Sequence, residues 1–129
     1  MSTAPKRSLL DEFRAARAHG NERVLATAHL GIKRFFNLDA AAYRDAVDKG
    51  GLDSRTKELL GLVASLTLRC DDCVAYHLDR CVEAGWSEKE IEDALFVGLV
   101  VGGSIVIPHL RRARLVLEEL LTEQRRAQR

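Results

Sequence analysis

Apolar residues recur every three to four positions through most of the chain, which is the spacing of one face of a helix. No stretch alternates between apolar and polar residues for long enough to indicate a strand. The pattern predicts seven helical segments, at about 9–20, 21–36, 39–50, 53–69, 72–83, 87–102 and from 108 to at least 121. The predicted fold class is therefore all-α, a single-domain bundle of about six to seven helices.

Residues that start and end helices set the expected boundaries. Asp39 is a candidate N-cap for the third segment, and Asp53 or Ser54 begins the fourth. Ser87 and Glu90 have the spacing of a capping box, and Pro108 suits the first turn of the last helix. Glycines are expected to end the first, third, fifth and sixth segments.

The chain is expected to form one domain over residues 1–129, with N-terminal helices in 1–51 and a core region in 52–115. The fourth segment is apolar on nearly every side and is expected to be central. Residues 94–110 form the longest apolar run, but they are fewer than a membrane span needs and are interrupted by a Gly pair and a proline. They are interpreted as a buried helix followed by a break.

Charge and cysteine content restrict the possible functions. The chain has 20 basic and 19 acidic residues, a formal net charge of +1, which argues against a dedicated nucleic-acid binder. Residues 1–8 lack the apolar stretch of a signal peptide. The chain has three cysteines, and an odd number of cysteines does not fit a disulfide framework. A cytoplasmic protein without membrane or nucleic-acid partners is expected.

The sequence Cys70-Asp-Asp-Cys73-Val-Ala-Tyr-His77 carries the candidate chemistry. Residues three and four apart share a face of a helix, so Cys70, Cys73 and His77 are expected to meet. Two cysteines at this spacing can form and release a disulfide, and an imidazole one turn after Cys73 can take its proton. The motif lies where a helix begins, and a helix N-terminus favours a thiolate. We therefore expect a redox site in which the pKa of Cys73 falls below its ordinary value.

The same residues allow two alternatives to a redox site. The cysteines could be ordinary core residues, since free cysteines are often buried, and Cys81 is expected to be a small buried residue of this kind. Alternatively, Cys70, Cys73, His77 and Cys81 could bind zinc, but four ligands on one short helix start make poor tetrahedral geometry. No metal and no organic cofactor are expected.

The motif becomes more specific together with Glu58, twelve positions before Cys70, and with the apolar segment between them. The stretch KELLGLVASLTLRCDDCVAYHLDRCVEAGWSEKEIEDAL resembles the core of the carboxymuconolactone decarboxylase family, and in particular its alkylhydroperoxidase D-like branch. The resemblance is close over about residues 52–115 and loose before Gly51.

This resemblance implies roles for four residues. Cys73 would attack a peroxide, Cys70 would resolve the product into a disulfide, and Glu58 and His77 would relay protons. His77 would lie nearest Cys73, and Glu58 nearer Cys70. The sequence departs from the pattern at Asp72, where the best-known peroxidase members have a histidine.

The expected function is therefore a thiol peroxidase or disulfide oxidoreductase that is recycled by an external dithiol. The alternatives are a lactone decarboxylase, as the family name suggests, and a non-catalytic oligomer whose cysteines sense redox state. The resemblance also implies a homo-oligomer, a trimer or a hexamer, and the apolar surplus agrees with this.

Four other side chains are interpreted as structural. His29 and His109 stand alone in the sequence, although His109 could lie near the site. Tyr76 and Trp86 have the character of packing residues.

Overall fold

A computed structural model describes residues 7–129; residues 1–6, which include most of the segment inspected for a signal peptide, lie outside it. The described chain is all-α, as predicted, with six α-helices, two 3₁₀ turns and no strand. The elements are α1 (Leu9–Leu25), α2 (Leu30–Ala42), η1 (Val47–Lys49), α3 (Ser54–Thr67), α4 (Asp71–Glu83), α5 (Glu88–Gly102), η2 (Ser104–Val106) and α6 (Ile107–Ala127).

The local start signals from residue 53 onward are confirmed. Asp53 is the N-cap of α3, and its Oδ1 accepts a hydrogen bond from the Thr56 N–H at 2.6 Å. Ser87 and Glu90 form the complete capping box of α5. Pro108 lies in the first turn of α6. These signals act within four residues, so they did not depend on the tertiary fold.

The predicted end of the first helix at Gly20 is wrong, because α1 continues through this glycine to Leu25. One glycine inside a helix costs only about 1 kcal/mol, which its helix-forming neighbours offset. The break falls instead at residues 26–29. There the Thr27 hydroxyl donates to the Val24 carbonyl at 2.8 Å, and His29 caps α2 by accepting from the Ile32 N–H at 3.3 Å.

The helix predicted at 39–50 is also wrong. Asp39 lies inside α2, and the chain leaves the helix at Tyr43. A short 3₁₀ turn follows and ends at Gly50, whose φ of 79° suits a glycine. The loop closes on itself, since the Gly51 N–H donates to the Ala46 carbonyl at 2.8 Å and the Ala46 N–H donates to the Leu52 carbonyl at 2.9 Å.

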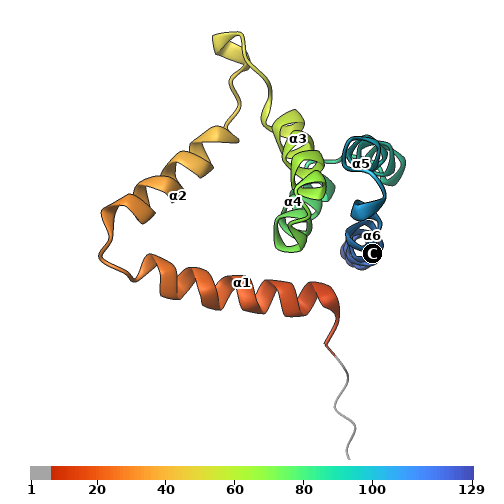
Figure 1. Ribbon diagram of the computed structural model, residues 1–129, viewed down its shortest axis with the longest axis horizontal. Helices are drawn as coiled ribbons and strands as arrows, with labels where there is room; N and C mark the ends of the chain where they lie inside the picture. Colours follow the sequence, from red (N-terminus) through yellow and green to blue (C-terminus); the bar gives the residue numbers. More distant parts are fainter. Residues whose placement is uncertain (1–6) are drawn as a thin grey trace, which may run out of the picture.

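The four C-terminal helices form the bundle. α3 packs on both α4 and α5, and α4 packs on α6, so α3 is central as its apolar pattern predicted (Figure 1). α1 crosses α6 and α4 with Leu10 and Phe13 as its buried residues. The bundle core consists mainly of aliphatic side chains, of which the most completely buried are Leu62, Leu66, Leu78, Ile91, Val106 and Leu117.

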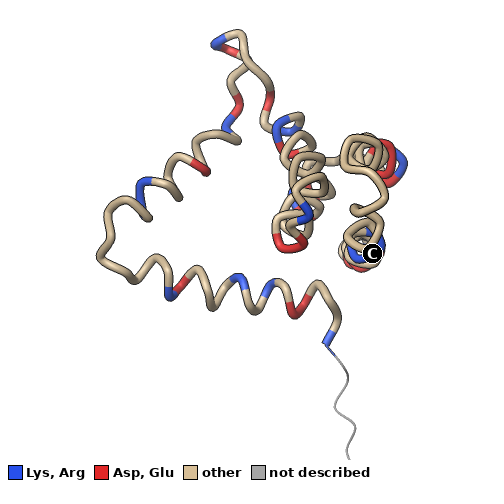
Figure 2. The backbone as a smooth tube through the Cα atoms, viewed as in Figure 1, with Lys and Arg blue, Asp and Glu red and all other residues tan. Residues whose placement is uncertain are grey.

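Residues 26–53, which we call the arm, stand away from this bundle (Figure 1). No residue of the arm is buried, and Phe35 in α2 is 65 % exposed. The arm contacts the bundle again just after α2, where the Lys57 ammonium donates to the Arg44 carbonyl at 2.7 Å. Charges of both signs occur along α1 and α2 (Figure 2).

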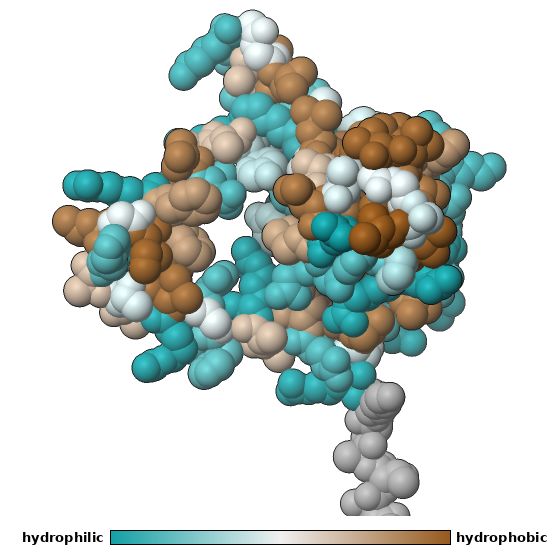
Figure 3. Space-filling model, in the orientation of Figure 1, coloured by the Kyte–Doolittle hydropathy of each residue, from teal (hydrophilic) through white to brown (hydrophobic). Residues whose placement is uncertain are grey.

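The predicted break within residues 94–110 is present, but the predicted burial of this segment is wrong for the isolated chain. α5 ends at Gly102 and the 3₁₀ turn η2 leads into α6. One face of α5 packs inward, while the opposite face exposes Phe96, Val97, Val100 and Val101. Figure 3 shows this apolar surface over α5 and a second one over α2. Within residues 7–129 no helix is both long and apolar enough to cross a membrane.

Candidate active site

The site is built on the three-residue junction between α3 and α4, residues 68–70. The Cys70 N–H donates to the Ser65 carbonyl at 3.1 Å and the Arg69 N–H to the Leu66 carbonyl at 3.0 Å, the bonding pattern of a Schellman motif. Arg69 occupies the left-handed position with φ 60°, where glycine is usual. This turn delivers Cys70 to the start of the next helix.

Cys70 is the N-cap of α4. Its Sγ accepts a hydrogen bond from the Cys73 N–H at 3.4 Å, so the two cysteines lie on the same side of the first turn. Cys73 is the third residue of α4 and is exposed, whereas Cys70 is half-buried. Both thiols are free. The structure thus brings together the predicted pair at a helix N-terminus.

Glu58 and His77 form a buried pair behind the cysteines. The Glu58 carboxylate lies 2.9 Å from His77 Nδ1, and the two residues are 7 % and 6 % exposed. The two expected proton-relay residues are thus in direct contact, and the position of Glu58 nearer Cys70 stays a prediction. α3 presents Glu58 and Gly61 on one face, and the imidazole packs against Gly61 so closely that no side chain fits there.

Tyr43, the C-cap of α2, completes the surroundings of His77. Its hydroxyl lies 3.3 Å from His77 Nε2, and the two ring centroids are 5.2 Å apart. The ring of Tyr76 meets the other side of the imidazole edge-on, at 5.1 Å. Both nitrogens of His77 are therefore engaged, one by Glu58 and the other by Tyr43.

A pocket of about 450 Å³ opens onto these groups. Cys73, His77 and Tyr43 line it together with residues from α1, among them Phe13 and Arg17. The guanidinium of Arg17 lies 4.5 Å from the centre of the Tyr76 ring. The pocket thus joins the exposed thiol, the imidazole and the phenol in one space large enough for a small organic molecule.

The expected lowering of the Cys73 pKa is wrong for the resting protein. Although part of the side chain reaches solvent, partial burial raises the pKa of Cys73 to about 11, with further contributions from the hydrogen bond to Cys70 and the charge of Asp72. The favourable helix N-terminus does not outweigh these effects. At neutral pH Cys73 is therefore a thiol, and a base must remove its proton during any reaction as a nucleophile.

Cys81 lies in the core and is fully buried, as predicted. Burial raises the pKa of Cys81 to about 12, and the charge of Glu58 contributes in the same direction. Such a thiol is inert toward exchange at neutral pH. In the part of the chain that the structure describes, no three or more His, Cys, Asp or Glu side chains are grouped to hold a metal ion.

The remaining candidates have structural partners. His109 Nδ1 lies 2.8 Å from the carboxylate of Asp71, so it ties the start of α6 to the residue that follows Cys70. His29 caps α2, and the Trp86 indole N–H donates to the Arg55 carbonyl at 3.0 Å. Asp72 is exposed at the pocket rim beside Cys73.

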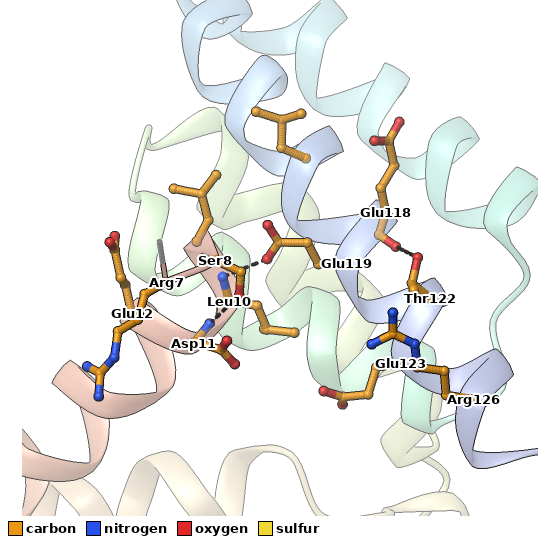
Figure 4. Close-up of a pocket in the computed structure, with 12 residues that line it drawn as sticks. Arg7, Ser8, Leu10, Asp11, Glu12, Glu118, Glu119, Thr122, Glu123 and Arg126 are labelled. Carbon is orange, nitrogen blue, oxygen red and sulfur yellow. Dashed lines mark hydrogen bonds between the residues drawn. The ribbon is translucent and has the colours of Figure 1, made fainter. Parts of the chain in front are cut away.

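A larger hollow of about 920 Å³ lies between the start of α1 and α6. There the Glu119 carboxylate accepts the Leu10 N–H at 2.7 Å, and the Ser8 hydroxyl accepts the Asp11 N–H (Figure 4). No cysteine or histidine lines this hollow. The Glu119 bond joins α6 to the first turn of α1, and the Ser8 bond caps α1 itself.

Sequence reasoning missed Tyr43 and Gly61. Gly61 had a usable signal, because a glycine inside an apolar helix, three residues after a candidate carboxylate, indicates close packing on that face. Tyr43 had none: it stands in a stretch that was interpreted as helix, and only the tertiary fold brings it to His77.

Comparisons with known proteins agree with the all-α fold. The model of the carboxymuconolactone decarboxylase family matches residues 33–118. A crystal structure of a member of this family from Thermotoga maritima is 55 % identical, with a TM-score of 0.83, over 92 % of this chain and 97 % of that one; its description connects it, as a possibility, with the antioxidative response.

Two more distant proteins are also similar. A family member from Legionella pneumophila has the same fold, with a TM-score of 0.68 at 21 % identity over 86 % of this chain and 93 % of that one. A curated relative from Paracoccus denitrificans, an uncharacterized protein of the cox locus, is 27 % identical over 67 % of this chain and 74 % of its own length.

Proposed function

Since the chain belongs to the carboxymuconolactone decarboxylase family, we propose that it is an alkylhydroperoxidase D-like thiol peroxidase or disulfide oxidoreductase that works through Cys70 and Cys73. One observation carries the proposal: an exposed thiol at a helix N-terminus shares a pocket with the buried Glu58–His77 pair, and a second thiol lies in the same helical turn. This is the arrangement that a two-cysteine peroxidase needs.

The chemistry follows from the positions of these groups. Cys73 loses its proton toward the imidazole, and its sulfur attacks one peroxide oxygen. The O–O bond breaks, the leaving oxygen takes up a proton as water or an alcohol, and Cys73 becomes a sulfenic acid. Cys70 then attacks the sulfenic sulfur, releasing water and forming a disulfide. An external dithiol reduces the disulfide and returns both thiols.

The residues play different parts in this scheme. Cys73 is the attacking thiol because it is the more exposed of the pair and faces the pocket. Cys70 is the resolving thiol, since its sulfur already contacts the Cys73 backbone. His77 accepts the proton, and Glu58 holds the imidazole and stabilises its charged form. The suggested antioxidative connection of the Thermotoga relative supports this assignment.

Thiol titration before and after one equivalent of peroxide tests the proposal. The chain has three cysteines, so three thiols should fall to one, and an added dithiol should restore three. Peptide mapping should place the link between residues 70 and 73. Retention of all three thiols, or a dominant link from Cys73 to Cys81, would contradict the proposed chemistry.

The two other functions give different results in the same assays. A lactone decarboxylase would keep its activity when Cys70 and Cys73 are both replaced by serine. A non-catalytic redox sensor would form the disulfide once but would not turn over peroxide with a recycling dithiol. The paired cysteines at the pocket favour the peroxidase over both.

We also propose that the working form is a homo-oligomer, a trimer or a hexamer, in the cytoplasm. The exposed apolar faces of α5 and of the arm support this, because Val101 and Phe35 are 70 % and 65 % exposed in the isolated chain. A soluble monomer rarely leaves contiguous apolar surfaces of this kind open.

A further inference from the structure

His77 does not have a free nitrogen in this structure. Glu58 lies 2.9 Å from Nδ1 and the hydroxyl of Tyr43 lies 3.3 Å from Nε2. A carboxylate accepts hydrogen bonds and does not donate them, so the Nδ1–H donates to Glu58 and Nε2 is left as an acceptor. The Tyr43 O–H therefore donates to Nε2, and the three side chains form one directed chain of hydrogen bonds.

The phenol oxygen of Tyr43 can still accept a hydrogen bond, and Tyr43 lines the pocket. Tyr43 and Cys73 line the same cavity, and the negative charge of a Cys73 thiolate is among the influences that raise the pKa of Tyr43, after burial and the charges of Asp39 and Glu58. The phenol is thus protonated at neutral pH. Tyr43 thus contacts His77 Nε2 and lines the same pocket as Cys73, so its hydroxyl can also accept a hydrogen bond from a group in that pocket.

The other charged groups around Tyr43 do not offer an equivalent route. Asp39 lies on the same helix, and Asp72 is exposed at the pocket rim. Arg17, from α1, is a permanent cation held over the Tyr76 ring and cannot accept a proton. Tyr76 packs against the imidazole edge, and no hydrogen bond joins its hydroxyl to His77 among the described residues.

We propose that Tyr43 is a proton-transfer residue that carries the Cys73 proton to His77. This deepens the proposed function and rests on it for its place in catalysis. The Cys73 thiol gives its proton to the Tyr43 oxygen while the Tyr43 proton passes to His77 Nε2. The sulfur is left as the nucleophile, and Glu58 stabilises the imidazolium.

The same path returns the proton after the O–O bond breaks. The imidazolium gives its Nε2 proton to Tyr43, and Tyr43 gives its own proton to the departing oxygen, which leaves as water or an alcohol. No proton is exchanged with solvent in this half-reaction. Tyr43 is the C-cap of α2, a helix without a buried residue. This exposed helix therefore supplies the proton link between the thiol and the buried Glu58–His77 pair.

The test measures the rate of iodoacetamide modification of Cys73 against pH by mass spectrometry, in the native chain and in Tyr43→Phe. Phenylalanine keeps the ring against His77 and removes only the hydroxyl. We expect Tyr43→Phe to react at least about tenfold more slowly at pH 7, since general-base assistance contributes that much or more. The two rates should converge near pH 11, where the thiol ionises without help. Tyr76→Phe is the matched comparison and should keep the native shape of the profile.

Parallel profiles for the native chain and Tyr43→Phe would overturn the proposal, because a purely structural effect lowers the rate at every pH. If circular dichroism shows that Tyr43→Phe does not fold, the native protein still gives a decision. If a proton is transferred in the rate-limiting step, alkylation at pH 7 should show a normal solvent deuterium isotope effect. This effect should disappear above pH 11, where the thiol is already ionised. An inverse or absent effect at pH 7 would overturn the proposal.

Alkylation needs no peroxide, so the result separates two kinds of failure. If the native protein does not turn over peroxide, the proposed function fails, while the alkylation profiles still decide whether Tyr43 moves the proton. If peroxide is turned over and the profiles are parallel, the proposed function stands and the role of Tyr43 falls.

Discussion

The imidazole of His77 occupies the space that a side chain on Gly61 would need. A Cβ at position 61 would lie 2.6 Å from His77 Cε1 and 2.8 Å from Nε2, closer than real Cβ contacts allow. α3 can therefore hold the Glu58–His77 pair only with glycine at this position.

Gly61→Ala should push the imidazole away from Glu58 and Tyr43. We expect a loss of peroxide turnover and a destabilisation of roughly 1–3 kcal/mol in urea unfolding, the usual cost of overpacking. Gly20→Ala is the control for stability, because a Cβ there meets nothing within 4 Å. It should leave the protein equally stable or more stable, by up to about 1 kcal/mol. Equal stability of native protein and Gly61→Ala would show that α3 and α4 separate easily.

The left-handed conformation of Arg69 predicts a stabilising substitution. A non-glycine residue with φ 60° costs roughly 1–2 kcal/mol, which glycine avoids. Arg69→Gly should raise the urea midpoint. The greater conformational freedom of glycine in the unfolded chain should offset part of this gain in stability. Arg69→Ala removes the same long side chain but retains the Cβ, so it should give no such gain. A gain of equal size in both variants would assign the effect to the side chain.

The negative charge of Asp72 should lower the reactivity of the Cys73 thiol toward alkylation. The charge of Asp72 raises the pKa of Cys73, although partial burial and Cys70 contribute more. Asp72→Asn should therefore move the alkylation profile of Cys73 to lower pH and speed modification at pH 8. Asp93→Asn, on the exposed side of α5, is the charge-matched control and should leave the profile in place. A profile that does not move would mean that solvent screens the Asp72 charge completely.

The buried Cys81 thiol should cause the free energy of unfolding to fall as the pH rises above 9. Burial raises the pKa of this thiol from 9.0 to about 12, so the folded state keeps a proton that the unfolded state has lost. The stabilisation is complete below pH 9 and declines as the pH rises toward 12, by at most about 1.4 kcal/mol per pH unit. Urea unfolding between pH 8 and 11 should show a shallower decline for Cys81→Ala than for the native protein. Identical slopes would exclude Cys81 as the source.

The exposed face of α5 predicts assembly. Light scattering at micromolar concentration should give a mass well above the 14.4 kDa of one chain. Val100→Asp places a charge within this face and should reduce the mass, whereas Lys89→Glu changes a charge near the polar start of the same helix and should not. A native monomer would leave the apolar face without a role in self-association.

Local signals were enough to predict much of the fold. The capping residue Asp53, the Ser87–Glu90 box and Pro108 each act through neighbours within one turn, so the sequence alone located the helices after residue 53. The N-terminal third was predicted less well. Gly20 did not interrupt α1, and the turn after Leu25 depends on Thr27 and His29 side-chain bonds that resemble no standard signal. The division into residues 1–51 and 52–115 stays a prediction.

The candidate site was predicted from the close spacing of Cys70, Cys73 and His77 and from the family resemblance, which added Glu58. Cys70, Cys73 and His77 are within two turns of one helix, so spacing brought them together. The Glu58–His77 bond depends on the packing of α3 against α4, and the approach of Tyr43 depends on the path of the arm. The direction of the Cys73 pKa shift was wrong because burial and Asp72 outweigh the helix N-terminus in the folded chain.

The arm is weakly anchored to the bundle. The temperature at which the protein loses activity should therefore lie below the temperature at which its core unfolds. Because the arm buries no side chain of its own, it can open in the isolated chain while the bundle of α3 to α6 remains folded. Tyr43 leaves His77 in that opened state, and the catalytic proton path is cut before the core melts. Heat should then inactivate the protein reversibly below its unfolding transition, and any contact that holds α2 in place, including one from a neighbouring subunit, would raise the working temperature without stabilising the core.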